Sequence, residues 1–493
     1  MHSTPSLSSL GQGIEMSPAE TEAEPTPLVS DSGPSRQMRQ RGPGTTKPRI
    51  SSGASVLVPT SYAPGTTAWI ATTASLCYAF SYFWRYPIFM LPKHILDTPT
   101  MTVFGKTLSL QECFSMSFIL GFGAAKIPAM RLATSGFFFR HRLALLLGIL
   151  ISSMLLVALP ILLLEGLEFL QVLGVFSSSF ISSFLYGGMV TYLEGRQSTE
   201  IMLAAIAASL TVAGTLSRAA ATALLGWGLP ARLMPLVLGG CSCFLACICI
   251  VLTDRAPKPS RADVAARSAR TAMTSRQQWD FVRNHAFGVV ASISAWAGLV
   301  GLRSFRDFYA QQVYTAALAE PPSSKVYAMA DIPGAVTSFI SLVLMSWVKD
   351  SQKALRLMLV ICASGLVVIA VLTWLLREGW LDGISWLLLY SAAFYTSFSM
   401  LNAPLNERIF AVSRAEGTCS FLIFASDGAG YVVTIGLLMY QSFGPLSNTN
   451  AEVVLELFVQ LLYILTVPIV FLLLMSVRYF SRSVYCHAHV AAL

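Results

Sequence analysis

Five basic residues stand inside stretches of sequence that are otherwise apolar, namely Arg85, Lys126, Arg218, Arg303 and Arg306. A charged side chain at the centre of a bilayer costs about 2.5–3.5 kcal/mol on insertion scales, so each of them needs a partner or a ligand. Guanidinium groups present hydrogen-bond donors in a planar fork that matches carboxylate and phosphate. The first chemistry that these residues suggest is therefore the binding of an anion.

Arg85 is preceded by two tyrosines at helical spacing. Tyr78, Tyr82 and Arg85 fall at positions i, i+4 and i+7, which places two phenol hydroxyls and a guanidinium on one helix face. This pattern predicts a clamp for an anion. The alternative is that Arg85 lies near the outer end of its helix and extends its charge to the membrane surface.

Arg303 and Arg306 lie three residues apart and share one helix face, and Asp307 follows Arg303 by four residues. A local ion pair between Arg303 and Asp307 is one interpretation. The other makes one of the two arginines the symmetry mate of Arg85, so that two cations meet one anionic substrate. Lys126, in the run SFILGFGAAKIP, either faces a cavity or extends to the inner membrane surface.

Two acidic residues also fall within apolar stretches, Asp331 in MADIPGA and Asp427 in ASDGAGY. A carboxylate inside a membrane can carry a proton in coupled transport, or it can make a polar contact with a neighbouring helix. Ser399, Asn402 and Asn406 form a stripe at i, i+3 and i+7. That stripe suits interhelical hydrogen bonds and substrate contact equally well.

Acid and base pairs recur at the ends of two apolar stretches. Glu194 and Arg196 stand in TYLEGR, and Glu407 and Arg408 stand in PLNER, at an offset of about 213 residues. Such pairs can form in one conformation and separate in another, so we expect a gate or a structural latch. Arg85 and the Arg303–Arg306 pair repeat at a similar offset, which indicates an internal duplication.

No catalytic or metal-binding motif is apparent in the sequence. A row of four thiols, at Cys241, Cys243, Cys247 and Cys249, lies on a single apolar helix that cannot fold around one ion, so packing is the expected role. Nucleophile and base residues at workable spacing, Walker motifs and zinc-protease motifs are not found. We expect no enzyme activity, no metal and no cofactor.

The composition places these residues in a membrane. Of the 493 residues, 54% are hydrophobic and 12% are charged, against roughly 25% charged in soluble domains. The net charge of +8 does not indicate nucleic-acid binding, because most Lys and Arg residues lie between apolar runs. The partners expected are the lipid bilayer and a small-molecule solute.

A helix needs about 20 apolar residues to cross the hydrocarbon core. That length predicts an all-α membrane fold with twelve spans, at 68–90, 110–130, 143–164, 169–193, 199–225, 231–253, 286–308, 327–348, 355–376, 384–407, 418–442 and 455–477.

The spans group into two six-helix halves, and the basic residues between spans suggest their orientation. The predicted organisation is a disordered tail (1–66), a first half (67–253), a basic linker (254–284), a second half (285–480) and a short tail (481–493). Most of the 33 Lys and Arg residues fall on one side, which predicts that both termini are cytoplasmic. Whether the membrane is the plasma membrane or that of an organelle is left open.

Several segments, in this order, carry a resemblance to a known family: YFWRYPIFMLPK, GFGAAKIPAMRL, YLEGRQSTE, SFRDFYAQQVY, DIPGA with VKDSQKAL, and FLIFASDGAGY. Together they cover about residues 70 to 485 and are similar to an uncharacterised group of major-facilitator-like membrane proteins known as a domain of unknown function. The resemblance implies a twelve-helix bundle of two pseudo-symmetric halves, with no substrate assigned.

More distantly, the tyrosine-rich run before Arg85 and the glycine-rich run before Lys126 resemble the first two helices of organophosphate and phosphate antiporters. That likeness implies that Arg85, Lys126, and Arg303 or Arg306 meet a phosphate. The segment RLATSGFFFRHR departs from the facilitator pattern because it lacks the usual arrangement of Gly and Asp. An inner latch of the common kind is therefore not expected.

We expect a secondary active transporter of a small solute, an organic anion, that works by alternating access. It would be a symporter or antiporter, with a proton or an anion as the counter-substrate. A membrane receptor or scaffold that keeps this fold without transporting anything is the alternative. A pocket plugged by bulky apolar side chains, with Arg85 neutralised internally, would favour the receptor.

Overall fold

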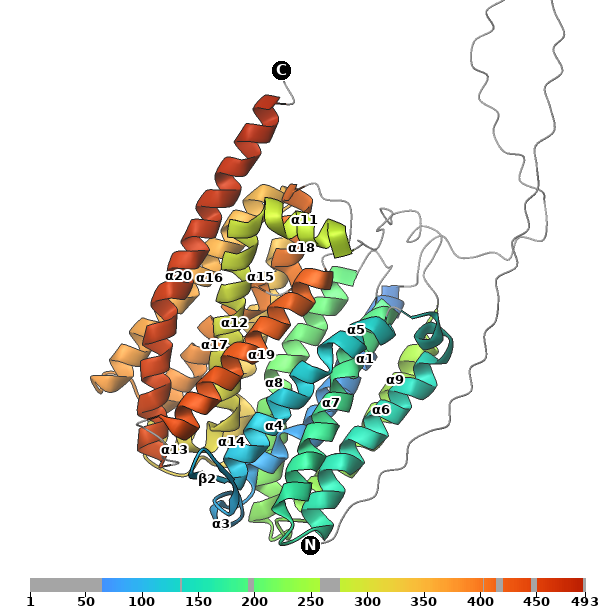
Figure 1. Ribbon diagram of the computed structural model, residues 1–493, viewed down its shortest axis with the longest axis vertical. Coiled ribbons are helices and arrows are strands. Elements are labelled where there is room, and N and C mark those ends of the chain that lie inside the picture. The colour runs from blue at the N-terminus through green and yellow to red at the C-terminus, as the bar shows by residue number, and fades with distance from the viewer. Residues whose placement is uncertain are drawn as a thin grey trace, which may run out of the picture. The chain divides into compact units, whose positions relative to one another are not determined.

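The computed structural model describes residues 64–133, 135–193, 199–257, 275–401, 403–413, 420–444 and 450–490 (Figure 1). Most of the expected tail 1–66 and of the expected linker 254–284 lies outside these residues. The described chain is almost entirely helical, with one two-stranded hairpin.

The first expected half contains ten helical segments and the hairpin. They are α1 (Pro64–Phe80), α2 (Tyr82–Arg85), the 3₁₀ turn η1 (Pro87–Met90), α3 (Lys93–Leu96), β1 (Pro99–Val103), β2 (Lys106–Ser109), α4 (Leu110–Ala124), α5 (Lys126–Ala133), α6 (Gly136–Leu163), α7 (Glu168–Leu193), α8 (Thr199–Gly226) and α9 (Met234–Asp254).

The second expected half follows a short helix, α11 (Ser275–Asn284). Its segments are α12 (Ala286–Phe308), α13 (Ala310–Leu318), α14 (Ser324–Ala330), α15 (Ile332–Ser346), α16 (Ser351–Arg377), α17 (Gly383–Leu401), α18 (Ala403–Ser413), α19 (Ser420–Phe443) and α20 (Ala451–Val490). We call the end of the bundle where α9 ends and α11 begins the linker end, and the opposite end, which bears β1 and β2, the hairpin end (Figure 1).

Ten helices in the described part of the chain are long and apolar enough to cross a membrane. They begin with Arg140–Leu163 and end with Ala451–Ser481, and they correspond to the third to twelfth expected spans. The first two expected spans correspond to α1 with α2 and to α4 with α5, and neither is among these ten helices. The protein is a multi-pass membrane protein.

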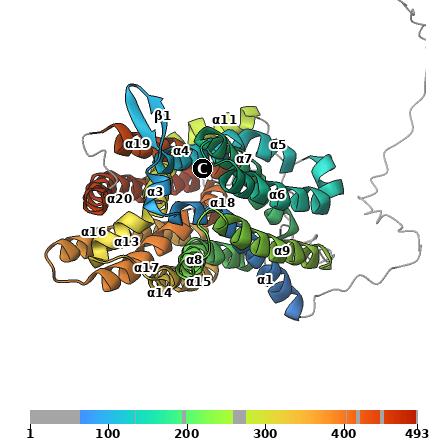
Figure 2. The same ribbon diagram turned by 90° about the horizontal axis from the view of Figure 1, so that it is seen from below.

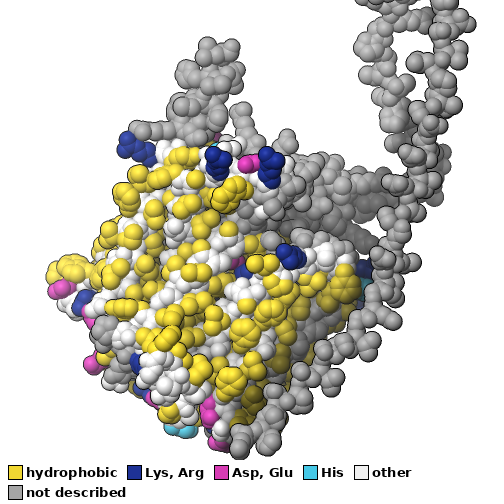
Figure 3. All heavy atoms as spheres, viewed as in Figure 1, with side chains coloured by type: hydrophobic (Ala, Val, Ile, Leu, Met, Phe, Trp, Pro, Cys, Tyr) yellow, Lys and Arg dark blue, Asp and Glu magenta, His cyan; other side chains and the backbone are white. Residues whose placement is uncertain are grey.

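The outer surface of the bundle is apolar between its two ends. Large hydrophobic side chains such as Phe169, Val467 and Phe471 are more than half exposed, which only a lipid environment tolerates at this density. Figure 3 shows hydrophobic side chains over the visible face, with charged side chains gathered toward its two ends.

Helix packing in the first half repeats in the second. In the first half α1 packs on α8 and α9, α7 packs on α4 and α6, and α6 packs on α9. In the second half α12 packs on α19 and α20, α17 packs on α15 and α16, and α16 packs on α20. Between the halves, α8 packs on α15 just as α19 packs on α4 (Figure 2). The two halves are therefore pseudo-symmetric.

Two glycines allow close contacts in equivalent helix pairs of the two halves. A Cβ at Gly121 of α4 would lie 2.9 Å from the Ser179 Cβ of α7, and a Cβ at Gly334 of α15 would lie 2.7 Å from a ring carbon of Tyr395 on α17. These distances are shorter than any van der Waals contact between carbon atoms. Small residues at these positions let the helix backbones approach each other.

Helix breaks fall beside several of the residues that the sequence singles out. The break between α1 and α2 is at Ser81, the break between α4 and α5 precedes Lys126, and the break between α14 and α15 is at Asp331. Interrupted helices are a common feature of transporter binding sites, because they bring free backbone groups and charged side chains to the middle of the bundle.

Candidate functional site

A pocket with a water-accessible volume of about 100 Å³, partly open to solvent, lies between the two halves. Its walls come from α7 and α8 on one side and from α12, α15, α16, α17 and α18 on the other. Leu203 and Arg408, which line it, belong to the ends of α8 and α18 near the linker end, and Thr211 and Arg303 lie deeper. The pocket therefore opens toward the linker end.

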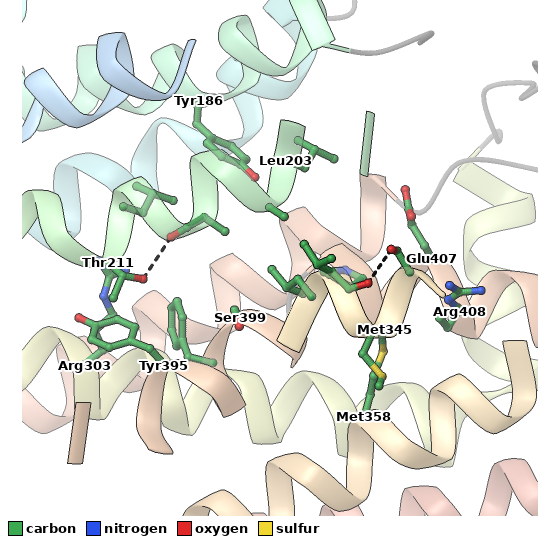
Figure 4. A pocket seen from close by; sticks show the side chains of 18 residues that line it. Tyr186, Leu203, Thr211, Arg303, Met345, Met358, Tyr395, Ser399, Glu407 and Arg408 are labelled. Atoms are coloured by element: carbon green, nitrogen blue, oxygen red, sulfur yellow. Dashed lines mark hydrogen bonds between the residues drawn. The ribbon is translucent and has the colours of Figure 1, made fainter. Parts of the chain in front are cut away.

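Figure 4 shows Arg303 and Tyr395 together at one end of the pocket and Glu407 and Arg408 at the other. Two methionines, Met345 and Met358, lie on the side of Glu407 and Arg408. Since the pocket is lined largely by apolar side chains, Arg303 is an unusual residue at its deep end.

Arg303 has few partners for a guanidinium in this position. Its side chain is 17% exposed, and its Nε lies 3.6 Å from Asp307 Oδ2, too far for a hydrogen bond. That Nε is buried without a hydrogen-bond partner. The guanidinium carbon lies 5.1 Å from the centroid of Phe398 and 5.9 Å from that of Tyr395, within the range of cation–π attraction.

Asp307 is shared among three arginines. Arg218 Nη2 lies 3.3 Å from Asp307 Oδ1 and donates a 2.7 Å hydrogen bond to the Asp307 carbonyl. Arg306 Nη2 lies 3.5 Å from the same Oδ1. One carboxylate therefore serves three guanidinium groups, and the contact to Arg303 is the longest of them. The Arg303–Asp307 pair suggested by the sequence exists, but it is only part of this cluster.

Arg306 is satisfied by other groups and faces away from the pocket. It is buried, and it donates hydrogen bonds of 3.1 and 2.8 Å to the two carboxylate oxygens of Asp331. It also donates a 2.8 Å bond to the Tyr395 hydroxyl. Asp331 is thus a partner of Arg306 between α12 and α15, and Arg306 does not line the pocket.

The charges around Arg303 do not cancel. Arg218, Arg303 and Arg306 meet two carboxylates, Asp307 and Asp331, so this cluster carries one positive charge in excess. Buried cations without matching anions are costly in a low-dielectric interior. Because Arg303 has the weakest contacts and faces the pocket, it is the place where an added anion would lower this cost most.

Arg85 is buried behind the pocket, with 3% of its surface exposed. Its Nε donates a 2.8 Å hydrogen bond to the Ser81 carbonyl, and its Nη2 donates to the Ser81 hydroxyl. The guanidinium carbon lies 4.5 Å from the ring centroid of Tyr82 and 5.6 Å from that of Tyr78. Among the described residues, no carboxylate lies within 4.0 Å of Arg85.

The predicted face of Tyr78, Tyr82 and Arg85 therefore exists, with the two phenol rings packed against the guanidinium. Tyr78 also contacts Tyr186, which lines the pocket, at a ring-centroid distance of 5.5 Å. Tyr78 and Tyr186 thus form a chain of aromatic contacts from Arg85 to the pocket.

Lys126 pairs with Asp427 across the two halves. Its Nζ donates a 2.8 Å hydrogen bond to Asp427 Oδ2, and the two side chains are 16% and 19% exposed. The pair joins α5 to α19, and the Lys126 ammonium also lies 5.3 Å from the Tyr431 ring centroid. The position of each residue in an apolar stretch suggested a functional role beside a structural one, but did not predict that the two would meet.

The structure describes only some of the remaining predicted residues. Glu194, Arg196 and Asn402 lie outside the described residues. Glu407 and Arg408 line the pocket near its opening, where Arg408 Nη1 donates a 3.4 Å hydrogen bond to the Ser351 hydroxyl. In the described part of the chain, no group of three or more His, Cys, Asp or Glu side chains could hold a metal ion.

The hairpin end is closed by contacts that sequence reasoning missed. Gln312 Nε2 donates a 2.8 Å hydrogen bond to Gln111 Oε1, and Gln111 Nε2 donates a 3.1 Å bond to the Phe308 carbonyl. Phe308 packs against Phe89 at a centroid distance of 5.0 Å. Together with the Arg218–Asp307 pair, these contacts join the halves between the pocket and the hairpin end.

The hairpin itself adds a further bridge. Its turn, Phe104 and Gly105, has positive φ at both residues, as type I′ hairpin turns require. Phe104 packs against Phe443 at the end of α19, with ring centroids 6.0 Å apart. Lys106 donates a hydrogen bond to the Ser442 carbonyl in the same helix turn. The hairpin of the first half thus holds the end of a helix of the second.

The chain belongs to DUF5690, a family of unknown function, whose pattern matches residues 101–483. Comparison with curated protein sequences gives no match.

Solved structures of major-facilitator transporters share the fold. The nucleoside transporter NupG is similar with a TM-score of 0.52 at 14% identity, over 83% of this chain and 98% of that protein. The human organic anion transporter MFSD10 is similar with a TM-score of 0.50 at 13% identity, over 83% of this chain and all of that protein. At these identities the likeness establishes the major-facilitator fold.

Proposed function

We propose that the protein is a secondary active transporter that carries a small organic anion across a membrane by alternating access. The observation that carries this proposal is the position of Arg303. It is a cation at the deep end of a pocket between two pseudo-symmetric halves, and it shares one carboxylate with two other arginines. An anion bound there would balance the excess charge.

The predicted boundaries give the moving parts. The halves 67–253 and 285–480 rock about the pocket, joined by the linker 254–284. In the conformation described above, the pocket opens toward the linker end and the hairpin end is closed. For the pocket to open at the hairpin end, the Arg218–Asp307 and Gln111–Gln312 contacts must separate. If both termini are cytoplasmic, this conformation faces the cytoplasm.

The remaining site residues have supporting roles in this proposal. Arg85, held by Tyr78 and Tyr82, contributes positive potential behind the pocket and could reach the anion if the two rings move aside. Asp331 fixes Arg306 and thereby leaves Arg303 as the available cation. Lys126 and Asp427 form an ion pair that can break during rocking or exchange a proton. Glu194, Arg196, Glu407, Arg408 and Asn402 stay proposed as gate or substrate contacts.

Two observations favour a transporter over a receptor or scaffold that retains the fold. A receptor would need no solvent-connected pocket at the centre of the bundle, whereas this pocket lies between the halves and is partly open to solvent. In addition, Arg85 is packed against aromatic rings and is not neutralised by a carboxylate among the described residues.

Uptake into proteoliposomes tests the proposal. We expect wild-type protein to accumulate one or more labelled organic anions from a panel of carboxylates, sulfonates and phosphate esters, and Arg303→Gln to abolish this uptake. Arg377→Gln is the matched control, because Arg377 pairs with Glu456 on the surface, outside the pocket. Failure of the wild-type protein to move any anion on the panel would contradict the proposed function.

A further inference from the structure

The polar groups that line the pocket are mostly occupied by the protein itself. The Thr211 hydroxyl donates a 3.1 Å hydrogen bond to the Ala207 carbonyl, the Ser346 hydroxyl a 2.7 Å bond to Val343, and the Ser399 hydroxyl a 3.3 Å bond to Thr396. Each of these acceptors belongs to the same helix as its donor. These three hydroxyl protons are therefore not available to a substrate.

Tyr395 is occupied in the same way. Its hydroxyl accepts a hydrogen bond from Arg306 at 2.8 Å and donates to Asp331 Oδ2 at 3.3 Å. The guanidinium of Arg303 is thus the strong donor left at the deep end of the pocket, with a buried Nε that makes no hydrogen bond. One fork-shaped donor fits one carboxylate or sulfonate group.

The walls between Arg303 and the pocket opening are apolar. Leu210, Leu342 and Met358 line them, and Phe398 lies beside the guanidinium of Arg303. A sugar or nucleoside would leave its hydroxyls unpaired against such walls, and each unpaired polar group lowers affinity. An apolar or aromatic body would instead gain by leaving water.

The size of the charge also restricts the ligand. The cluster of Arg218, Arg303 and Arg306 exceeds its two carboxylates by one positive charge. Arg85, the other buried cation without a carboxylate partner among the described residues, does not line the pocket. A single negative charge therefore neutralises the excess at the pocket, whereas a second one in the same apolar pocket would lie there unpaired at a high desolvation cost. The charge balance therefore favours a monoanion.

We infer that the substrate is an amphipathic monoanion, with one carboxylate or sulfonate bound by Arg303 and an apolar, preferably aromatic, body against Leu210, Leu342, Met358 and Phe398. This inference rests on the proposed function and narrows its substrate class. Methionine side chains adapt to different shapes, so the pocket accepts a range of apolar bodies.

Titration calorimetry on the protein in nanodiscs, with empty nanodiscs as the blank, tests the charged group and the apolar body of the ligand separately. The probes are naphthalenesulfonate, which has both features; methanesulfonate, which lacks the apolar body; naphthalenesulfonamide, which lacks the charge; and naphthalenedisulfonate, which adds a second charge. We expect naphthalenesulfonate to bind on the order of a hundredfold more tightly than methanesulfonate. We also expect it to bind at least about tenfold more tightly than the sulfonamide or the disulfonate.

Two variants assign these differences to the pocket. Arg303→Gln should reduce the affinity for naphthalenesulfonate to that of the sulfonamide, and Arg377→Gln should leave it unchanged. Leu210→Gln should lower the affinity for naphthalenesulfonate and leave the affinity for methanesulfonate unchanged. The comparison of the four probes on the wild-type protein stands even if a variant fails to fold.

The possible contrary results are distinct. Equal binding of naphthalenesulfonate and methanesulfonate would overturn the amphipathic class while leaving anion transport in place. If the sulfonamide bound as tightly as naphthalenesulfonate, charge would not contribute to binding. If the disulfonate bound more tightly than naphthalenesulfonate, the preference for a monoanion would be wrong. Absence of binding by all four probes, with uptake of a phosphate ester in the transport assay, would overturn this inference and keep the proposed function.

Discussion

Lys126 and Asp427 join the two halves of the bundle, with a distance of 2.8 Å between Nζ and Oδ2. The residues are 301 positions apart in the chain, and the helices that carry them, α5 and α19, belong to different halves. In a protein whose halves rock, such a pair stabilises one arrangement of the halves relative to another. Its strength therefore affects both stability and transport.

We predict that Lys126→Met and Asp427→Asn each lower stability, because each leaves the other residue without its partner in a partly buried position. The double variant should lose less than the sum of the two, with a coupling of about 0.5–3 kcal/mol. Thermal unfolding in detergent measures the stabilities of the wild type, the two single variants and the double variant, which together form a double-mutant cycle. Strictly additive effects would mean that the ion pair contributes nothing to the interface.

The excess charge at Arg303 predicts that substitutions of two neighbouring residues, Asp307 and Arg303, have different effects on stability. Asp307→Asn removes a carboxylate shared by three guanidinium groups and should destabilise the protein by about 3–5 kcal/mol. Arg303→Gln removes the unbalanced charge and should leave the melting temperature unchanged or raise it, while binding is lost. Binding sites commonly trade stability for function in this way.

Differential scanning fluorimetry of the two variants beside the wild-type protein measures this contrast. A fall in melting temperature for Arg303→Gln as large as that for Asp307→Asn would show that Arg303 is a structural member of the cluster.

Gly334 predicts a packing defect that reaches the binding cluster. A Cβ there would lie 2.7 Å from the ring of Tyr395 and 2.8 Å from the Ser391 carbonyl, so Gly334→Ala must separate α15 from α17. Overpacking of this kind costs about 1–3 kcal/mol. It should also disturb the hydrogen bond from Arg306 to Tyr395 and weaken anion binding.

Gly436→Ala is the control for this variant, because nothing lies within 4 Å of a Cβ at that position of α19. Unfolding temperature and naphthalenesulfonate affinity are measured for both. If the two alanine variants behaved alike, the close approach of α15 and α17 would not matter for the site.

The hairpin predicts a way to lock the protein. Phe104 and Phe443 lie on different halves with their rings 6.0 Å apart, so a Phe104→Cys, Phe443→Cys double variant can be cross-linked with a short thiol reagent. If the hairpin end must open during each cycle, the cross-link should abolish uptake, and a reducible reagent should allow its recovery.

Either single variant, treated with the same reagent, serves as the control for the chain's own cysteines. Full uptake by the cross-linked double variant would indicate that the hairpin end does not separate at this point during transport.

Much of the membrane architecture could be predicted from the sequence, because span length and apolar composition follow directly from bilayer thickness. Ten expected spans correspond to helices of sufficient length and apolarity. The breaks at Ser81 and before Lys126 were not predicted. An apolar run indicates that a segment enters the membrane, but not where its backbone departs from helical geometry.

The partners of the charged residues were harder to predict. Helical spacing places Arg303 and Arg306 on one face, yet Arg306 is bound by Asp331 while Arg303 faces the pocket. Similarly, Arg218 was recognised as a cation inside a span, but its partner, Asp307, is 89 positions away. Such contacts depend on tertiary packing, and the spacing of residues within one helix gives no information about it.

Counterflow tests the central claim most directly, because only a carrier with a site that opens alternately at its two ends exchanges substrate for substrate. Proteoliposomes preloaded with unlabelled naphthalenesulfonate, a permanently charged anion that does not cross the bilayer as a neutral acid, are diluted into a trace of the labelled compound. We predict transient accumulation of label with wild-type protein and with Arg377→Gln, and none with Arg303→Gln or with empty liposomes. Label entry at the same rate in preloaded and unloaded wild-type proteoliposomes, or unchanged accumulation by Arg303→Gln, would contradict alternating access at an anion site built on Arg303.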